Sequence, residues 1–248
     1  AGKQPDIPGE AGQCRFYCQD PTQPLSMLRR DPLAQVALAH HLWSAYPSAV
    51  PFEKQGHFLW IPAVVDGTRT VLPHRTQHLT RPLLEDLLTL FRRSESMLFF
   101  FNALHAGASV NHIHLQSVFY GERLAIETAQ RSPSKVAAVG LLMGEGASGL
   151  VFDREVAAEI LFAPVDRLQS NDIPFNLILV GDRIFLIPRS ADHEVVPEFA
   201  GGVVASMELA GKIITNDRAV FESINRPSIA AVLGKVTLPV GEVLPEYA

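Results

Sequence analysis

Residues 111–119, NHIHLQSVF, place two histidines and a glutamine at alternate positions, with apolar or small residues between them. In a strand, His112, His114 and Gln116 would project together from one face, while the isoleucine and leucine between them point into the opposite layer. A neutral imidazole is a good nucleophile near pH 7, because its unperturbed pKa is about 6.5. Two strand histidines could instead bind a metal, but no third ligand lies nearby in the sequence. We therefore favour a catalytic role for this strand.

A turn of small residues, HAGAS at 105–109, comes shortly before the two histidines. Small residues allow backbone amides to approach an anion closely. Asn102 lies at the end of the preceding apolar run, and Ser109 lies in the turn itself. We expect these groups together to hold a phosphate.

The apolar pattern of the whole chain predicts strands that alternate with helices. Apolar runs bounded by turn residues predict strands at 56–65, 68–73, 96–104, 111–119, 173–180, 183–190 and 201–215. Helical spacing and capping residues predict helices at 29–47, 81–94 and 154–169, with a short helix near the C-terminus. Asp31, Thr80 and Asp153 are the residues expected to start the three longer helices. Hairpins interleaved with helices favour an α+β fold with a mainly antiparallel sheet.

The composition limits the class of protein and its partners. The chain has 248 residues, of which 47% are hydrophobic, and a net charge of −5. This balance suits a globular protein with a real core and gives no reason to expect a nucleic acid partner. No apolar run reaches the roughly 18 residues that a membrane span needs, so we expect no membrane partner either. We expect residues 1–13 to form a flexible tail and residues 14–248 to form a single domain.

Cys14 and Cys18 are the only cysteines of the chain. So few cysteines make a disulfide framework improbable and favour a reducing, cytoplasmic setting. Their spacing also differs from the usual zinc-knuckle spacing of about two intervening residues. We therefore interpret them as two ordinary thiols.

Two segments of the chain resemble each other. HFLWIP at 57–62 and RIFLIP at 183–188 share the form of a strand that ends in proline. Two related halves of one chain would leave such a similarity in its sequence. We retain two related halves as one possible organisation of the domain.

Residues 101–119, FNALHAGASVNHIHLQSVF, resemble the active-site segment of the histidine triad superfamily. The match is closer to its transferase and phosphorylase branch, whose third triad position is glutamine and which includes galactose-1-phosphate uridylyltransferase and diadenosine tetraphosphate phosphorylase. Within that branch the chain looks most like the GDP-hexose phosphorylases, which act on GDP-galactose or GDP-glucose. The segments 56–62, 171–190 and 204–214 are also similar to that family. The resemblance implies the histidine triad-like (HIT-like) form of an α+β fold.

The resemblance also implies a role for each matching position. His114 would be the nucleophile, and His112 would orient it, partly through its backbone carbonyl. Gln116 would donate a hydrogen bond to the α-phosphate. Asn102, Gly107 and Ser109 would line the phosphate site. Arg189 could enter the site from the second half of the chain.

The glutamine favours transfer over hydrolysis. An amide can donate a hydrogen bond to a phosphate oxygen but cannot usefully give up a proton. A sugar phosphate leaves as a stable anion, and an incoming phosphate needs no general base. We therefore expect phosphorolysis or nucleotidyl exchange through a nucleotidyl-histidine intermediate.

Zinc-containing uridylyltransferases carry a metal site that this chain could copy. In those enzymes two cysteines and a further histidine join the first histidine of the motif, and Cys14, Cys18, His74 and His112 could match that set. The GDP-hexose branch does not need this metal. We therefore expect neither a metal nor any other cofactor in this chain.

We predict that the chain is an enzyme that phosphorolyses a nucleoside-diphosphate hexose, with GDP-hexose as the favoured substrate. Its partners would be the sugar nucleotide and inorganic phosphate, and a homodimer is an open alternative to a monomer. A dinucleoside polyphosphate phosphorylase and a hexose-1-phosphate uridylyltransferase are the alternative enzymes. A nucleotide-binding protein without turnover is the alternative from another class. A panel of sugar nucleotides, assayed with and without phosphate, separates these functions.

Overall fold

The structure is a computed structural model of the chain. It describes residues 14–20, 22–23, 26–27, 30–66, 69–144, 146–199 and 202–248. The tail predicted at residues 1–13 lies outside the described residues.

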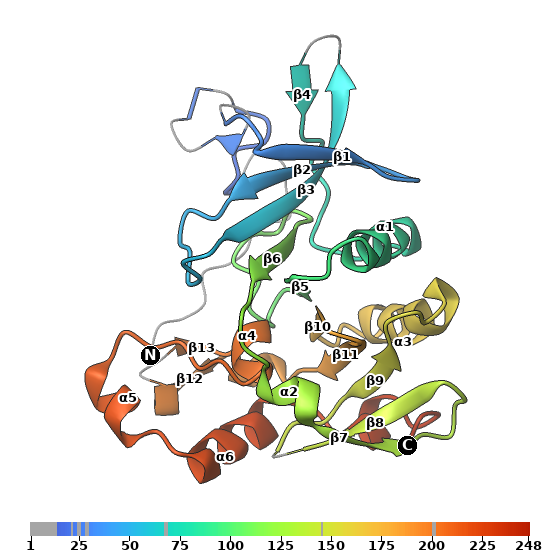
Figure 1. Cartoon of the computed structure of the whole chain (residues 1–248), viewed down its shortest axis with the longest axis vertical. Helices are drawn as coiled ribbons and strands as arrows, with labels where there is room; N and C mark the ends of the chain where they lie inside the picture. Colours follow the sequence, from blue (N-terminus) through green and yellow to red (C-terminus); the bar gives the residue numbers. More distant parts are fainter. Residues whose placement is uncertain are drawn as a thin grey trace. The chain divides into compact units, whose positions relative to one another are not determined.

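The chain divides into two compact units (Figure 1). Of the described residues, the N-terminal unit contains those of 14–99 together with Ala108–Gly121, and the C-terminal unit contains Phe100–Gly107 together with those of 122–248. Strand β5, Met97–Asn102, runs from one unit into the other. The single domain predicted for residues 14–248 stays a prediction.

The N-terminal unit is built around an antiparallel sheet. Its strands follow the order β1-β2-β3-β6, and β4 pairs with β3. The strands are β1 Ala34–Ala37, β2 Leu42–Pro47, β3 His57–Asp66, β4 Arg69–Val71 and β6 Leu115–Phe119. The hairpin predicted from the Asp66-Gly67 pair is confirmed by the pairing of β3 with β4.

The helix predicted at 29–47 is wrong, because this segment forms the hairpin of β1 and β2. Leucine and alanine favour a helix locally, but pairing of β2 with β3 outweighs that weak preference. Trp43 of β2 is fully buried, and its indole N–H donates to the carboxylate of Asp86 at 3.0 Å. This tertiary hydrogen bond and the strand pairing therefore select the extended conformation.

Helix α1, Arg81–Arg92, confirms the second predicted helix. Thr80 is its N-cap residue, but the Thr80 side chain makes no capping hydrogen bond. The leucines of α1 and Phe91 are buried, as the apolar spacing predicted. The helix therefore contributes an apolar face to the core of the N-terminal unit.

The C-terminal unit contains a second run of antiparallel strands, in the order β10-β11-β9-β8-β7. These strands are β7 Gln130–Pro133, β8 Val139–Met143, β9 Leu150–Asp153, β10 Phe175–Val180 and β11 Arg183–Pro188. The predicted hairpin of β10 and β11 is confirmed, with Gly181 at a φ of 58° in its turn. A two-stranded sheet joins β12, Val195–Val196, to β13, Gly202–Val203.

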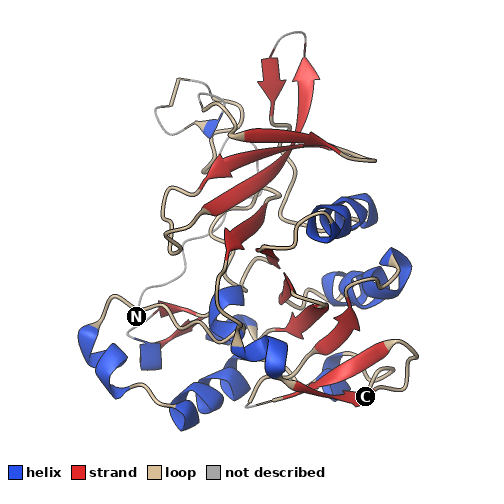
Figure 2. Cartoon of the chain, viewed as in Figure 1, coloured by secondary structure: helices blue, strands red, loops and turns tan. Residues whose placement is uncertain are grey.

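The C-terminal unit contains helices as well as strands (Figure 2). The helical elements are α2 Ala125–Thr128, α3 Ala158–Ser170, η3 Ala191–His193, η4 Pro197–Phe199, α4 Ser206–Leu209, α5 Arg218–Ser223, α6 Arg226–Val236 and α7 Val240–Val243. The predicted α+β architecture with a mainly antiparallel sheet is confirmed. Across the described ranges, every helix is too short or too polar to serve as a membrane span.

Two predicted boundaries in this unit are wrong. The helix predicted from Asp153 begins at Ala158, because Asp153 is the last residue of β9 and pairs with Arg183. The strand predicted at 201–215 is β13 followed by α4. The Glu208 carboxylate accepts the Ala205 N–H at 3.0 Å, which caps this helical turn and ends the extended segment.

The similar segments 57–62 and 183–188 lie in different units, on β3 and on β11. Each strand has an antiparallel neighbour on both sides. The relation of the two halves stays a prediction.

Candidate active site

The two histidines precede β6, which begins at Leu115 rather than at Asn111. Residues 75–77, which precede α1, bond to the histidine segment in the way that a neighbouring strand would. The Ile113 N–H donates to the Arg75 carbonyl at 2.8 Å, and the Asn111 side chain accepts the Gln77 N–H at 2.8 Å. The histidines are therefore held by local partners outside the regular ladder.

Gln77 fixes the backbone of His114 on both sides. Its side-chain oxygen accepts the His114 N–H at 2.9 Å, and its side-chain N–H donates to the His114 carbonyl at 3.1 Å. The Gln77 side chain is buried, so no water competes for these groups. Sequence reasoning missed this residue, because its partner lies 37 residues away.

We expect Gln77→Ala to destabilise the protein and to slow catalysis. The change leaves a buried N–H and a buried carbonyl of His114 without their partner, which costs about 3 kcal/mol in the free energy of unfolding. A displaced nucleophile also lowers turnover, by roughly tenfold or more. Urea denaturation and steady-state kinetics measure the two effects. Gln130→Ala, which removes an exposed glutamine on β7, should change neither, and equal effects of both variants would contradict this role.

His114 has the geometry of a neutral nucleophile. Its Nδ1 lies 2.8 Å from the carbonyl oxygen of His112. A carbonyl only accepts, so Nδ1 carries the proton and Nε2 keeps its lone pair. Burial lowers the pKa of His114 to about 4, so the ring is uncharged near pH 7. This is the hydrogen bond that the resemblance implied, while the catalytic role itself stays a prediction.

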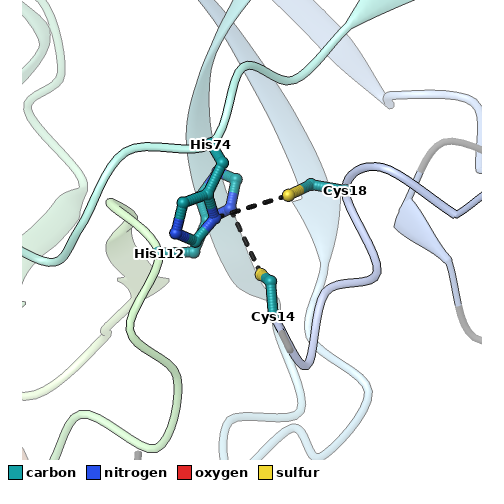
Figure 3. Close-up of side chains that lie close together, drawn as sticks. All are labelled: Cys14, Cys18, His74 and His112. Carbon is teal, nitrogen blue, oxygen red and sulfur yellow. Dashed lines mark hydrogen bonds between the residues drawn. The ribbon is translucent and has the colours of Figure 1, made fainter. Parts of the chain in front are cut away.

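His112 belongs to a cluster of metal-ligand atoms in the N-terminal unit (Figure 3). The ligand atoms of Cys14, Cys18, His74 and His112 all lie within 4.8 Å of one another. The Cys14 sulfur is 3.4 Å from Nδ1 of His112, and the Cys18 sulfur is 3.5 Å from Nδ1 of His74. Tetrahedral zinc sites have bonds of about 2.0–2.3 Å, which places their ligand atoms roughly 3.3–3.8 Å apart.

The chemistry of these donors fits zinc. A hydrogen bond from Cys18 lowers the pKa of Cys14, and the same hydrogen bond raises the pKa of Cys18. The pair therefore gives up one proton readily and needs a nearby cation to release the second. His112 is fully buried, and its Nδ1 faces the Cys14 sulfur. The structure assembles a donor set that would hold a zinc ion structurally, whereas the sequence alone favoured no metal, and the presence of the metal stays a prediction.

Phe16 lies between the two cysteines and covers both histidines. Its ring centroid is 5.4 Å from that of His112 and 5.3 Å from that of His114. An aromatic ring at this distance excludes water from the imidazoles, in keeping with the lowered pKa of His114. Sequence reasoning missed this residue too, because no motif marks it.

Gln116, the third residue of the predicted triad, lies on β6 and is half-buried. Its side-chain oxygen is 2.7 Å from Nε2 of His57, the first residue of β3. Ile113 and Leu115 are fully buried, as expected for the apolar layer. His57, a buried histidine that sequence reasoning missed, therefore contacts the third residue of the predicted triad.

Asn102 and Gly107, two of the predicted phosphate ligands, lie together in the C-terminal unit. The oxygen of the Asn102 side chain accepts from Asn176 at 2.7 Å and from the Ser206 hydroxyl at 2.6 Å. Asn176 also donates to the Ala106 carbonyl at 2.7 Å. This network fixes the orientation of the Asn102 amide through its oxygen.

The Gly107 turn is tight and already bonded. Gly107 has a φ of 101°, and an added Cβ would come within 2.5 Å of the Cβ of Ala205. Its N–H donates to the Glu194 carboxylate at 2.6 Å, so this amide is not open to an anion in this conformation. Burial raises the pKa of Glu194. The phosphate-binding roles of Asn102 and Gly107 stay predictions.

Ser109 belongs to the N-terminal unit, with the histidines. It is exposed, and its carbonyl oxygen lies 3.5 Å from the guanidinium of Arg15. Its predicted contact with phosphate also stays a prediction.

Arg189 is a buried support of the Asn102 network. It is fully buried, and its guanidinium donates to the Asn176 oxygen at 2.6 Å and to the Val236 carbonyl at 3.0 Å. Arg189 therefore orients Asn176, which in turn orients Asn102. The prediction that Arg189 enters the site itself stays a prediction.

The buried carboxyl of Glu208 predicts a pH-dependent stability. Burial raises the pKa of Glu208 to about 7, from an ordinary value of 4.5. The folded protein keeps a proton that the unfolded chain has already released, so its stability falls as the pH rises through this interval, by up to about 3 kcal/mol. Denaturant titrations at about pH 5 and pH 7.5 measure this change. Glu208→Gln should flatten it and exposed Glu222→Gln should not, whereas an unchanged slope in Glu208→Gln would refute this assignment.

The C-terminal part of the chain is similar to a family of known proteins. Residues 146–242 match the family described as GDPGP1-like, C-terminal domain. The chain is 27% identical over 205 residues to GDP-L-galactose phosphorylase 2 of Arabidopsis thaliana, covering 74% of this chain and 45% of that protein. It is 28% identical over 163 residues to GDP-D-glucose phosphorylase 1 of Danio rerio, covering 56% and 46%. The chain spans less than half the length of the curated relatives it matches.

Solved structures show the fold. Yeast Ap4A phosphorylase Apa2 superposes with a TM-score of 0.58 and 18% identity, over 79% of this chain and 72% of that one. The same enzyme in complex with Ap4A gives a TM-score of 0.57 at 19% identity, over 79% and 74%. The HIT-like fold predicted from residues 101–119 is thereby confirmed.

Proposed function

We propose that the chain is a HIT-like phosphorylase, which transfers a nucleotidyl group from a nucleoside-diphosphate hexose to inorganic phosphate. The observation that carries the proposal is the 2.8 Å hydrogen bond between Nδ1 of His114 and the His112 carbonyl. That contact leaves Nε2 as an uncharged nucleophile. The GDP-hexose phosphorylases among its relatives support GDP-hexose as the substrate.

The proposed reaction has two transfers. Nε2 of His114 attacks the α-phosphorus, an N–P bond forms, and the bond to the bridging oxygen breaks, so that hexose 1-phosphate leaves as an anion. The positive charge that develops on the imidazole is stabilised by the His112 carbonyl through Nδ1. Gln116 donates a hydrogen bond to a non-bridging oxygen, which stabilises charge in the transition state. An oxygen of inorganic phosphate then attacks the same phosphorus, releases His114 and forms the nucleoside diphosphate.

A substrate panel tests the function. GDP-, UDP- and ADP-hexoses and a dinucleoside tetraphosphate are incubated with the chain, with and without inorganic phosphate. We expect nucleoside diphosphate and hexose 1-phosphate only when phosphate is present, most rapidly from a GDP-hexose. Release of nucleoside monophosphate at the same rate without phosphate would instead identify a hydrolase. Tight binding without turnover or adduct would identify a binding protein.

The setting and the assembly of the enzyme are also proposals. The free thiols of Cys14 and Cys18 support a reducing, cytoplasmic compartment. A homodimer is retained as an alternative to a monomer, and light scattering of the purified chain decides between them.

A further inference from the structure

His57 contacts the side chain of Gln116, the third residue of the predicted triad. His57 is the first residue of β3, and its register partner on the adjacent strand β6 is Val118. Gln116 lies two residues before Val118 on β6. Nε2 of His57 is 2.7 Å from the side-chain oxygen of Gln116. His57 is buried, with 6% of its surface exposed, and its ring lies 4.2 Å from that of Phe52. The imidazole is therefore held in place by packing and presents one nitrogen to the amide.

The nature of the amide oxygen fixes the proton. An amide oxygen only accepts, so Nε2 of His57 must carry the hydrogen of this bond. The oxygen of Gln116 is then committed to His57, and its NH₂ group is left on the other side of the amide. A flipped amide would instead turn its oxygen outward, where it would repel an oxygen of a phosphate. Only the first arrangement supplies the donor that the proposed reaction needs.

We propose that His57 is a positioning residue, which holds the amide of Gln116 so that its N–H group faces the substrate phosphate. This inference rests on the proposed function and deepens it. His57 touches no substrate in this scheme and acts only through Gln116. The arrangement turns an amide that could otherwise rotate into a donor of fixed direction, as transition-state stabilisation requires.

The charge state of the ring agrees with this role. Burial is the largest effect on the pKa of His57 and lowers it, which favours the uncharged ring. A neutral imidazole has a single N–H, and donation to the Gln116 oxygen at 2.7 Å requires this hydrogen on Nε2. The position of this proton can be observed directly, whether or not the enzyme turns over.

The kinetic test compares three variants, two of His57 on β3 and one of Ser117 on β6. His57→Ala should lower kcat by roughly tenfold to a hundredfold, the value of a directed hydrogen bond to a charged group, with little change in KM for the sugar nucleotide. His57→Gln keeps an N–H at similar reach and should recover most of the rate. Ser117→Ala is the matched control, because it removes the acceptor of the Trp60 indole N–H at 2.8 Å, another buried hydrogen bond between β3 and β6. This control should lose stability and keep its kcat.

Two further measurements make the inference falsifiable. In a Gln116→Ala background, His57→Ala should cause no additional loss of kcat, because both changes remove the same interaction. Nitrogen-15 NMR of labelled histidine should find the His57 proton on Nε2 in the wild-type chain. A proton on Nδ1 alone, or a His57→Ala variant with the kcat of Ser117→Ala, would overturn the inference. A wild-type chain without adduct or turnover would overturn the proposed function, and the NMR result would then still decide where Gln116 points.

Discussion

His114→Ala is expected to abolish the covalent nucleotidyl adduct and to lower turnover by roughly four orders of magnitude or more, as removal of a catalytic nucleophile does in other enzymes. The expected size follows from the mechanism, because no other group is proposed to attack the α-phosphorus. Incubation of the wild-type chain with a sugar nucleotide, without phosphate, should add the mass of one nucleotidyl group, which is that of the nucleoside monophosphate less one water. An N–P bond to histidine is cleaved in acid and survives in base, so treatment of the adduct at low and high pH identifies the bond.

His114→Asn is the matched variant for this experiment. Asparagine can still donate to the His112 carbonyl, the partner of Nδ1 in the wild-type chain, but it lacks a nucleophilic nitrogen. This variant should therefore fold with nearly wild-type stability and still form no adduct. An adduct that persists in His114→Asn would show that the nucleophile is another residue, and loss of folding in both variants would direct the test to the wild-type adduct and its attachment site.

The parts of the fold that the sequence predicted correctly depend on local signals. Helix α1 follows from its leucine spacing, and the hairpin of β10 and β11 follows from the Gly181-Asp182 pair. The segment 29–47 has local signals for a helix and nevertheless forms β1 and β2. Its conformation is set by partners distant in sequence, including Asp86 and β3, which no local pattern contains.

The candidate site divides in the same way. His112, His114 and Gln116 were recognisable because they lie within one motif. Gln77 and His57 were not, because their partners in that motif lie 37 and 59 residues away. Neither residue has a type or spacing that marks it out. Contacts between residues so far apart in the sequence appear only once the chain is folded.

Removal of zinc is the second prediction with a large effect. Ions in structural sites with four protein ligands contribute directly to folding, with apparent binding free energies of about 10–16 kcal/mol in zinc-finger peptides. We expect the purified chain to contain about one zinc ion per molecule, and we expect chelation to lower its Tm sharply. Elemental analysis and a thermal melt in chelator measure the two quantities. Cobalt substitution should add the absorption bands of a tetrahedral thiolate site.

The position of the cluster gives this prediction its consequence for catalysis. His112 has two roles. Its Nδ1 is one of the ligand atoms of the cluster, and its backbone carbonyl accepts the Nδ1 proton of His114. Cys14 and Cys18, which pack within the apolar core cluster of the N-terminal unit, flank Phe16, whose ring covers both histidines. A zinc ion would therefore fix the backbone that selects the reactive tautomer of His114.

Cys14→Ser should lose the zinc ion, melt at a lower Tm and form no adduct. His78→Ala, at an exposed histidine in the same segment as His74, should keep the zinc ion, the Tm and the adduct. A zinc-free chain with an unchanged Tm and full adduct formation would remove the metal from this account and leave the hydrogen bonds of Gln77 as the support of the nucleophile.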